Sequence, residues 1–337
     1  MTQRLLVGID LSLKYNEVCL LSDRGDTLAQ RRFRHNWPGF QALVSWLRTT
    51  YQAGGYAGLD IAAEATGLLW FHLFYHLART TLLADDDRHS YLLNPRVVKA
   101  FKRALAERDK CDPNDAQVIA ERLRFARPAY EVQLDERYLP LQRLTRYRYH
   151  LAHDLGRQKL YARSVALYLK ASDYQVEPAF SDPFGATSVH ILSEYATLDE
   201  IAKLDVADLA EQLDQVGRHR FAAPEANAQR LVSIAQRSYP LAQCLVAPVN
   251  LILASLLERI EDLEGHLARL DEAIAAPLAH LPGAALLRSV PGLGPVYSAG
   301  LLAEIQDVHR FLAGDKRDRE GRLHPKTRDD GQAALAK

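Results

Sequence analysis

Two short apolar runs, each closed by an acidic residue, place the strongest constraint on the fold of this 337-residue chain. Residues 5–9 lead into Asp10, and residues 59–63, which are apolar apart from Asp60, lead into Glu64. Short apolar runs bounded by polar or turn residues favour buried strands, since helices need longer repeats. We therefore expect a sheet in which both acids stand at strand ends.

The segments around these runs predict an α/β domain. Residues 17–21 and 27–33 flank the turn sequence Asp-Arg-Gly-Asp, which is typical of a hairpin. Apolar residues at helical spacing follow in 38–51, and a second helix is expected to reach about residue 79. The order strand, hairpin, helix, strand, helix indicates a mixed sheet within residues 1–130. The stretch 85–90 is acidic and polar, and residues 85–87 are interpreted as a surface loop.

The second half of the chain predicts mainly helices. Apolar residues recur every three or four positions in 140–170 and 226–276, the spacing of long amphipathic helices. We expect a helical region over residues 131–280 and a partial helical domain over 281–337, so the fold class is α/β plus α. Several leucines favour helix pairing without defining an oligomer, namely Leu251, Leu256, Leu263, Leu267 and Leu270.

Positive charge is concentrated in one predicted helix. Lysine plus arginine equals aspartate plus glutamate at 42 each, so total charge does not indicate nucleic acid. Between positions 137 and 170, however, eight basic residues and five tyrosines accompany one acid, Asp154. Such a segment can bind a polyanion by phosphate neutralisation and stacking, although a solvated helix face is an equal alternative. The basic residues are Arg137, Arg143, Arg146, Arg148, Arg157, Lys159, Arg163 and Lys170.

Membrane, secreted and disulfide-rich classes are not favoured. No apolar run reaches the roughly 18 residues of a membrane span, and Met1 leads directly into a strand-like segment. Cys19, Cys111 and Cys244 lie far apart without a Cys-x-x-Cys pair, which argues against a disulfide framework and a zinc site. We expect a cytoplasmic protein.

Two further acids extend the pattern to four. Asp112 and Asp115 are three residues apart at a predicted helix start, so both can face the strand ends that carry Asp10 and Glu64. Four converging carboxylates would repel one another without cations, and a pair of Mg²⁺ or Mn²⁺ ions suits an all-oxygen site that acts on a phosphodiester. The alternative is structural, because Asp-Pro-Asn-Asp also caps a helix.

The same residues carry a family resemblance. Four segments resemble, in order, the motifs of the insertion-sequence one-hundred-and-ten family of transposases, which have a RuvC-like DEDD domain: 7–10 (VGID), 63–67 (AEATG), 94–95 (NP) and 110–116 (KCDPNDA). Cys111 stands where threonine is usual. The resemblance implies an RNase-H-like (RuvC-like) fold for residues 1–130. It also implies that the catalytic residues and ligands of Mg²⁺ or Mn²⁺ are Asp10, Glu64, Asp112 and Asp115.

The C-terminal part resembles the start of the same family's second domain. Residues 287–296 contain a Pro-Gly-Leu-Gly sequence that also resembles a helix-hairpin-helix turn. In such a turn Gly292 and Gly294 would let backbone amides approach a DNA phosphate, and a simple tight turn is the alternative. No family-like serine motif follows residue 311, and the serines beyond residue 285 are Ser289 and Ser298. We therefore expect a chain that ends before this domain is complete.

By this resemblance, the expected activity is DNA recombination guided by an RNA transcribed from the mobile element. The expected partners are DNA, that guide RNA and further copies of the chain, in a dimer or tetramer. Two alternatives remain, a metal-dependent structure-selective nuclease of the Holliday-junction type and a non-catalytic nucleic-acid-binding remnant. Candidate nucleic-acid-binding residues are Lys110, Arg143, Arg146, Arg148, Arg157, Lys159, Arg163, Gly292 and Gly294.

Overall fold

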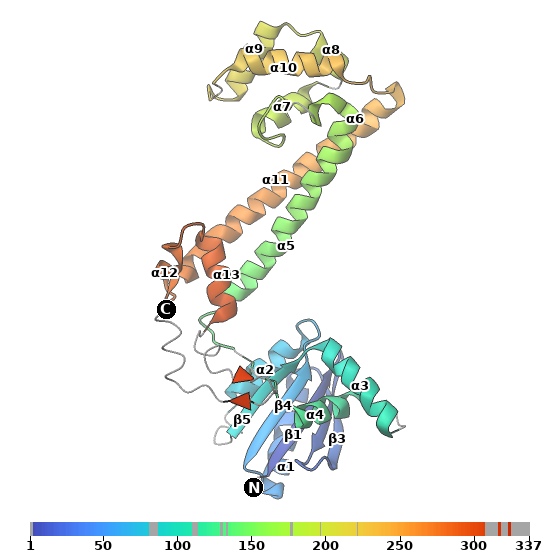
Figure 1. Ribbon diagram of the computed structural model, residues 1–337, viewed down its shortest axis with the longest axis vertical. Coiled ribbons are helices and arrows are strands. Elements are labelled where there is room, and N and C mark those ends of the chain that lie inside the picture. Colours follow the sequence, from blue (N-terminus) through green and yellow to red (C-terminus); the bar gives the residue numbers. More distant parts are fainter. Residues whose placement is uncertain are drawn as a thin grey trace. The chain divides into compact units, whose positions relative to one another are not determined.

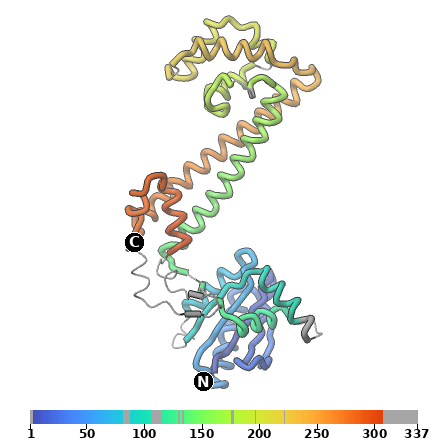
Figure 2. Tube along the Cα trace, in the orientation of Figure 1, coloured from blue at the N-terminus to red at the C-terminus, as the bar shows by residue number. Residues whose placement is uncertain are grey.

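The computed structural model describes residues 3–80, 87–109, 114–128, 131–132, 134–175, 178–195, 197–220 and 222–306, together with two short strands. These strands, β6 (Lys316–Arg317) and β7 (Leu323–His324), pair antiparallel. The rest of the described chain forms two compact units, which meet in sequence between Glu136 and Arg137. Figures 1 and 2 trace the chain through both units.

The first unit is an α/β structure. Its described elements are β1 (Arg4–Leu11), β2 (Tyr15–Leu21), β3 (Thr27–Arg34), α1 (Trp37–Gly54), β4 (Gly58–Glu64), α2 (Leu69–Arg79), β5 (Asp87–Leu93), α3 (Pro95–Asp109) and α4 (Asp115–Phe125). The strands form one mixed sheet in the order β3-β2-β1-β4-β5. Strands β1 to β3 are antiparallel neighbours, whereas β4 runs parallel to β1, and β5 parallel to β4. The mixed sheet and its helices confirm the α/β prediction for this part of the chain.

Helices cover both faces of this sheet (Figure 1). Successive side chains of a strand point to opposite faces. Leu5, Val7 and Ile9 therefore pack with α1 and α2, while Leu6 and Gly8 face α3 and α4. A strand covered on both faces carries apolar residues at nearly every position. This explains why residues 5–9 form an unbroken apolar run.

Strand β5 shows that the loop interpretation of residues 85–87 was wrong at Asp87, where the strand begins. Residues 87–93 form an edge strand that pairs in parallel with β4. Polar contacts explain why its sequence does not look like a strand: Asp87 pairs with Arg4 of β1, and His89 Nε2 lies 2.7 Å from Asp87 Oδ1. Residues 85 and 86 lie outside the described residues.

The second unit is helical. Its described elements are α5 (Leu139–Tyr161), the π-helical turn η2 (Ala162–Leu167), α6 (Tyr168–Lys170), the 3-10 turn η3 (Ser172–Gln175), α7 (Ala186–Glu194), α8 (Leu198–Ala202), α9 (Val206–Val216), α10 (Pro224–Arg237), α11 (Gln243–Ala279), α12 (Ala284–Arg288) and α13 (Pro295–Ile305). The helical prediction for 140–170 is confirmed. The stretch 226–276 is divided between α10 and α11, since Pro240 has no backbone N–H with which to continue a helix.

The long helices α5 and α11 run side by side (Figure 2). Leu263 and Leu267 of α11 are buried against Leu151 of α5, and Leu256 lies in the adjoining buried cluster. The leucine spacing therefore reflects, at least in part, helix pairing within one chain. Leu251 is 69% exposed and takes no part in that contact.

Helix α11 also bears on the expectation that the chain has no membrane span. Within the described part of the chain, it is the helix long and apolar enough to cross a membrane by length and composition alone. Core helices of soluble proteins can meet the same criterion. The side of α11 that carries Leu253, Leu257 and Ile260 is buried within the helical unit.

Candidate active site

Asp10 and Glu64 lie at the same end of the sheet of the first unit. Strands β1 and β4 run parallel and are in register up to Ile9 and Ala63, so the next residue of each strand is an acid. Because alternate side chains of a strand share a face, both acids lie on the face that α4 covers. The fold thus places these two predicted site residues on adjacent strands.

Gly8 allows α4 to approach this end of β1. A Cβ atom at position 8 would lie 2.1 Å from the carbonyl oxygen of Ala116 and 2.5 Å from the amide nitrogen of Ala120. Both contacts are with backbone atoms, so a side chain here would require α4 to move. Since α4 begins at Asp115, capped by the side chain of Asn114, this glycine of the VGID motif helps to place Asp115.

The charges of these acids are coupled. Burial raises the pKa of Asp10 above its ordinary value, and the nearby carboxylates of Asp115, Glu64 and Glu17 raise it further. Glu17 is an addition to the predicted site, and it pairs with Asp10 across the β1–β2 hairpin. The signal for it is the short turn after Leu11, which fixes the hairpin register and so brings residue 17 opposite residue 10.

Polar neighbours contact the same acids. The Thr66 hydroxyl donates to Glu64 Oε1 at 2.9 Å, and Lys102 Nζ donates to Asp115 Oδ1 at 2.9 Å. Lys102 belongs to α3 and has no place in the motifs of the sequence. It brings a positive charge to a group of acids that otherwise repel one another.

Asp112 and Lys110 lie outside the described residues. Among the residues that the structure does describe, no three histidine, cysteine, aspartate or glutamate side chains lie close enough together to hold a metal ion. Asp10, Glu64 and Asp115 nevertheless offer only oxygen donors, which Mg²⁺ and Mn²⁺ prefer. Their donor chemistry fits a divalent ion, and movement of side chains would be needed to bring them onto one.

Four of the basic side chains predicted to bind nucleic acid on α5 form ion pairs within the second unit. The pairs are Arg146–Glu304, Arg148–Asp271, Arg157–Asp154 and Lys159–Glu264. The last basic residue of the segment, Lys170, is buried and donates to the carbonyl oxygen of Leu192 at 2.7 Å. Burial lowers the pKa of Lys170 to about 8. Much of the positive charge seen in the sequence therefore serves contacts between helices.

One stripe of α5 remains exposed to solvent. Tyr149, His153, Arg157 and Tyr161 follow one another at four-residue intervals and are all exposed. Residues four apart lie on one face of a helix, and the rings of Tyr149 and His153 are 6.2 Å apart. This α5 stripe joins stacking groups and one positive charge on a single surface.

Two family models match the chain. A transposase model named DEDD_Tnp_IS110 matches residues 7–168, which contain Asp10, Glu64, Asp115 and the α5 stripe. A second model, the transposase IS116/IS110/IS902 family, matches residues 284–333. The chain belongs to the IS110 family of transposases. The resemblance carried by the motifs at 7–10, 63–67, 94–95 and 110–116 is thereby confirmed. The second match extends beyond residue 311, after which the sequence has no family-like serine motif.

Relatives of this IS110-family chain include proteins of mobile elements. The mini-circle putative transposase for IS117 of Streptomyces coelicolor is 26% identical over 89% of this chain and 71% of its own length. The insertion element IS116 uncharacterized 44.8 kDa protein of Streptomyces clavuligerus is 25% identical over 98% of this chain and 78% of its own length. The pilin gene-inverting protein of Moraxella bovis is 23% identical over 49% of this chain and 48% of its own length.

Among solved structures, the Ppx/GppA family member of Aquifex aeolicus is similar at 11% identity over 74% of this chain and 97% of its own length. The TM-score of 0.24 is too low to assign a fold from this likeness.

The glycine-containing turn of this IS110-family protein joins α12 to α13. Gly292 has a φ of 87°, in the left-handed region that other residues rarely adopt, and Gly294 precedes the first turn of α13. Ser289 donates to the carbonyl oxygen of Leu286, and Ser298 is fully buried. Ser298 is therefore closed to solvent, whereas Ser289 is exposed with its hydroxyl engaged by a backbone carbonyl oxygen.

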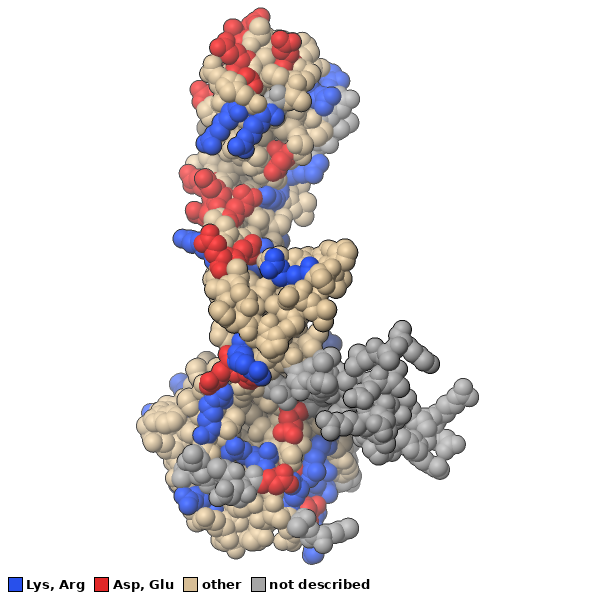
Figure 3. Space-filling view, turned by 90° about the vertical axis from the view of Figure 1, so that its left-hand side faces the viewer, with Lys and Arg blue, Asp and Glu red and all other residues tan. Residues whose placement is uncertain are grey.

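The surface around α12 and α13 is nearly without charge (Figure 3). Arg288 is the one lysine, arginine, aspartate or glutamate between residues 273 and 303. Contacts of this part with DNA would therefore depend on backbone amides more than on charged side chains.

Proposed function

We propose that this IS110-family chain is a DNA recombinase whose first unit is an RNase-H-like, metal-dependent nucleic-acid-processing domain. The observation that carries the proposal is the electrostatic coupling of Asp10 with Glu64 and Asp115, carried by two adjacent strands and the first residue of α4. An antiparallel β1–β3 meander extended by parallel β4 and β5 also supports the RNase-H-like assignment. The names of relatives, a transposase and a gene-inverting protein, support DNA rearrangement as the overall reaction.

In this proposal Asp10, Glu64, Asp115 and Asp112 hold Mg²⁺ or Mn²⁺. When bound, such ions stabilise the attacking and leaving oxygens of a phosphodiester during displacement. The protein's own groups orient the ligands: the Thr66 hydroxyl fixes one oxygen of Glu64, and Lys102 fixes one oxygen of Asp115. Glu17 lies beside Asp10 and helps to raise its pKa, while the carboxylate of Glu17 itself pairs with Arg32.

The activity should depend strictly on a divalent cation. We expect the purified protein, mixed with plasmid DNA carrying the element's ends and RNA transcribed from the element, to cleave DNA strands when Mg²⁺ or Mn²⁺ is present. Removal of the cation with EDTA should stop cleavage, because the coupled acids would be left without their counter-charge. Gel analysis of the plasmid measures this, with Ca²⁺ as the control cation. Cleavage at an undiminished rate in EDTA would remove the metal-dependent mechanism.

We also propose that the α5 stripe contacts the guide RNA. Unpaired bases stack on exposed tyrosines, and RNA is recognised mainly through such single-stranded parts. The stripe includes Tyr149 and Tyr161, both at least half exposed, and Arg157, whose side chain is 66% exposed beside Asp154. Arg146 and Arg148 are less suited to this role, since acids of α13 and α11 engage them.

Variants of the stripe should separate stacking from charge. We expect Tyr149→Ala to weaken binding of single-stranded RNA by about tenfold without changing its salt dependence, because stacking involves no counterion release. Arg157→Ala should lower the slope of log affinity against log salt by about 0.7, the value for one phosphate contact of a single strand. Fluorescence anisotropy at several salt concentrations measures both effects.

The matched control is Arg230→Ala, which removes an exposed arginine from α10. It should leave the affinity and the salt slope within error of the unaltered protein. Equal affinities and equal slopes for all three variants and the unaltered chain would show that the stripe is only a solvated helix face.

A further inference from the structure

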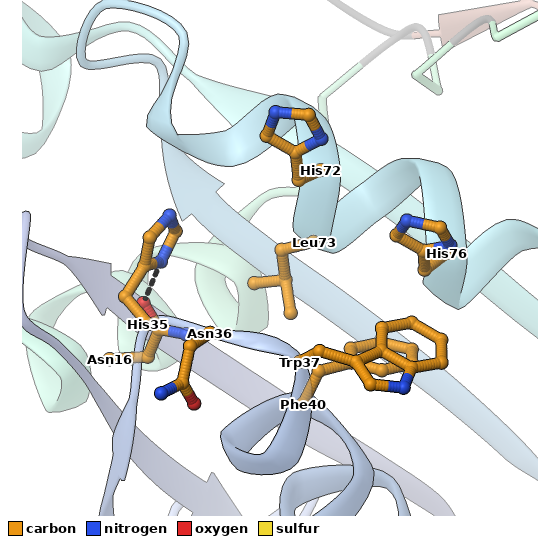
Figure 4. A pocket seen from close by; sticks show the side chains of 8 residues that line it. All are labelled: Asn16, His35, Asn36, Trp37, Phe40, His72, Leu73 and His76. Atoms are coloured by element: carbon orange, nitrogen blue, oxygen red, sulfur yellow. Dashed lines mark hydrogen bonds between the residues drawn. The ribbon is translucent and has the colours of Figure 1, made fainter.

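A small pocket lies on the other face of the sheet from the acids. It has a volume of about 260 Å³ and is open to solvent (Figure 4). It belongs to the first unit, and its walls come from β2, the residues that lead into α1, the first turn of α1, and α2. The lining residues are Asn16, His35, Asn36, Trp37, Phe40, His72, Leu73 and His76.

One wall of the pocket is aromatic. The rings of Trp37 and Phe40 stack with centroids 5.2 Å apart and an interplanar angle of 21°. His76 meets Trp37 edge-on at 5.0 Å, and Leu73 points into the space between the walls (Figure 4). Trp37 remains 54% exposed, so a large part of its ring surface is open to a ligand. An exposed aromatic ring at the wall of a pocket offers a surface on which a planar ligand can stack.

The opposite wall is polar and neutral. His35 Nδ1 and Asn16 Oδ1 lie 2.7 Å apart, and Asn16 is buried at 3% exposure. An asparagine oxygen can only accept, so the proton of this bond belongs to Nδ1, and Nε2 of a neutral His35 is an acceptor. Burial and the neighbouring His72 lower the pKa of His35, which favours this neutral ring. The edge of His35 can then accept a hydrogen bond from a ligand N–H.

The lining excludes other ligand classes. No lysine or arginine lines the pocket, which does not favour a phosphate. Among the described residues, no three histidine, cysteine, aspartate or glutamate side chains are arranged to hold a metal, so His35, His72 and His76 are not a metal site here. The volume is below the roughly 300–1,000 Å³ of sites for drug-sized ligands. A single planar, polar-edged ring system fits the remaining chemistry.

We propose that this pocket binds one unpaired nucleobase, stacked on Trp37 with its polar edge toward His35, as an anchor for the strand processed or held by the first unit. The identity of the bound strand rests on the proposed function, but the binding of a base in the pocket can be tested separately. Its location supports it, since Asn16 is adjacent to Glu17 on β2 and their side chains lie on opposite faces. A strand that crosses this end of the sheet could place a base in the pocket and a phosphate beside the acids.

Cross-linking to the full chain tests the site directly. Oligonucleotides carrying a single 5-iodouracil, as single-stranded DNA, single-stranded RNA and duplex DNA, are irradiated with the protein in EDTA, and the adducts are mapped by mass spectrometry. We expect adducts at Trp37, Phe40 or the pocket histidines with single strands and not with duplex. The DNA and RNA arms show which strand supplies the base. Adducts confined to other parts of the chain would overturn the proposal.

Affinity provides the second readout. Trp37→Ala should weaken binding of the strand that cross-links by about tenfold, as expected for one stacked base, and Trp37→Phe should recover most of the loss. Tyr239→Ala, which removes an 80% exposed tyrosine of the second unit, is the control. If Trp37→Ala misfolds, Trp37→Leu, which removes the stacking ring but keeps an apolar side chain, replaces it and should show the same loss. Affinities within twofold for every folded pocket variant would rule out the nucleobase site.

The two proposals fail in different ways. Loss of the pocket adducts with intact Mg²⁺-dependent cleavage would reject the pocket and leave the proposed function standing. Pocket adducts and a tenfold affinity loss in a protein that never cleaves DNA would support the pocket and reject the proposed reaction.

Discussion

Replacement of Asp10 with asparagine is expected to abolish metal-dependent DNA cleavage and to raise the stability of the metal-free protein. Asparagine keeps the shape of the side chain but removes the charge that a divalent ion requires. Activity should fall by more than about a hundredfold, the upper end of losses seen when only an outer partner of a metal ligand is removed. Cleavage assays with Mg²⁺ give the first value, and thermal unfolding in EDTA gives the second.

The pH dependence of the stability gain follows from the raised pKa of Asp10. A carboxyl whose pKa is higher in the folded chain binds more protons when folded, so metal-free stability falls as pH rises from the unfolded pKa through the folded one. The stabilisation by Asp10→Asn should therefore be absent below about pH 3.8, the ordinary pKa, and complete above the raised value.

The control for this variant is Asp262→Asn, at an exposed position of α11. It should change neither cleavage nor the melting temperature at any pH. If Asp10→Asn melted at a lower temperature than the unaltered protein in EDTA at pH 7, the repulsion among these acids would be refuted.

Asp60→Ala is expected to destabilise the first unit by about 3–5 kcal/mol, the cost of leaving a buried charge without its partner. Asp60 has no exposed surface, although it stands in an otherwise apolar strand. Its carboxylate accepts bonds from Arg4 Nε and Nη2, and Arg127 Nη2 lies 2.7 Å from Asp60 Oδ2. Removal of this acid leaves Arg4, whose side chain is only 17% exposed, with the more exposed Asp87 as its remaining carboxylate.

Tryptophan fluorescence measures this loss in the first unit alone, because Trp37, Trp46 and Trp70 all belong to it. Urea unfolding would be followed for the unaltered chain, Asp60→Ala and the control Asp87→Asn. The control removes a half-exposed charge and should cost no more than about 1 kcal/mol. Equal losses in the free energy of unfolding for the two variants would mean that the burial of Asp60 does not increase its contribution to stability.

Much of the first unit could be predicted because the residues that indicate its strands and turns lie close together in the sequence. An unbroken apolar run indicated β1, a run interrupted only by Asp60 indicated most of β4, and turn residues indicated the β2–β3 hairpin. Strand β5 was missed because its polar residues are satisfied by groups far away in the sequence: Asp87 pairs with Arg4, more than eighty positions earlier, and His89 pairs with Glu131. No pattern within residues 87–93 reveals such a partner.

The candidate site divides in the same way. Asp10 and Glu64 were indicated by the strand ends that carry them, and Asp115 by the motif at a helix start. Glu17 and Lys102 were not, since the first reaches the acids through hairpin register and the second through the packing of α3 beside α4. Asp112 belongs to the motif, and its place in the site remains a prediction.

The sequence by itself determined the family, the order of the motifs and the strands that end in acids, because each depends on residues close together in the chain. The tertiary structure alone decided which charges face solvent. On α5 the arginines look alike in sequence, yet Arg146 and Arg148 meet acids more than a hundred residues away, while Arg157 pairs with Asp154 on its own helix and stays exposed. A charged side chain contributes to a binding surface only if it stays exposed in the folded chain. Whether it does depends on acidic partners that are distant in sequence and that only tertiary packing brings near.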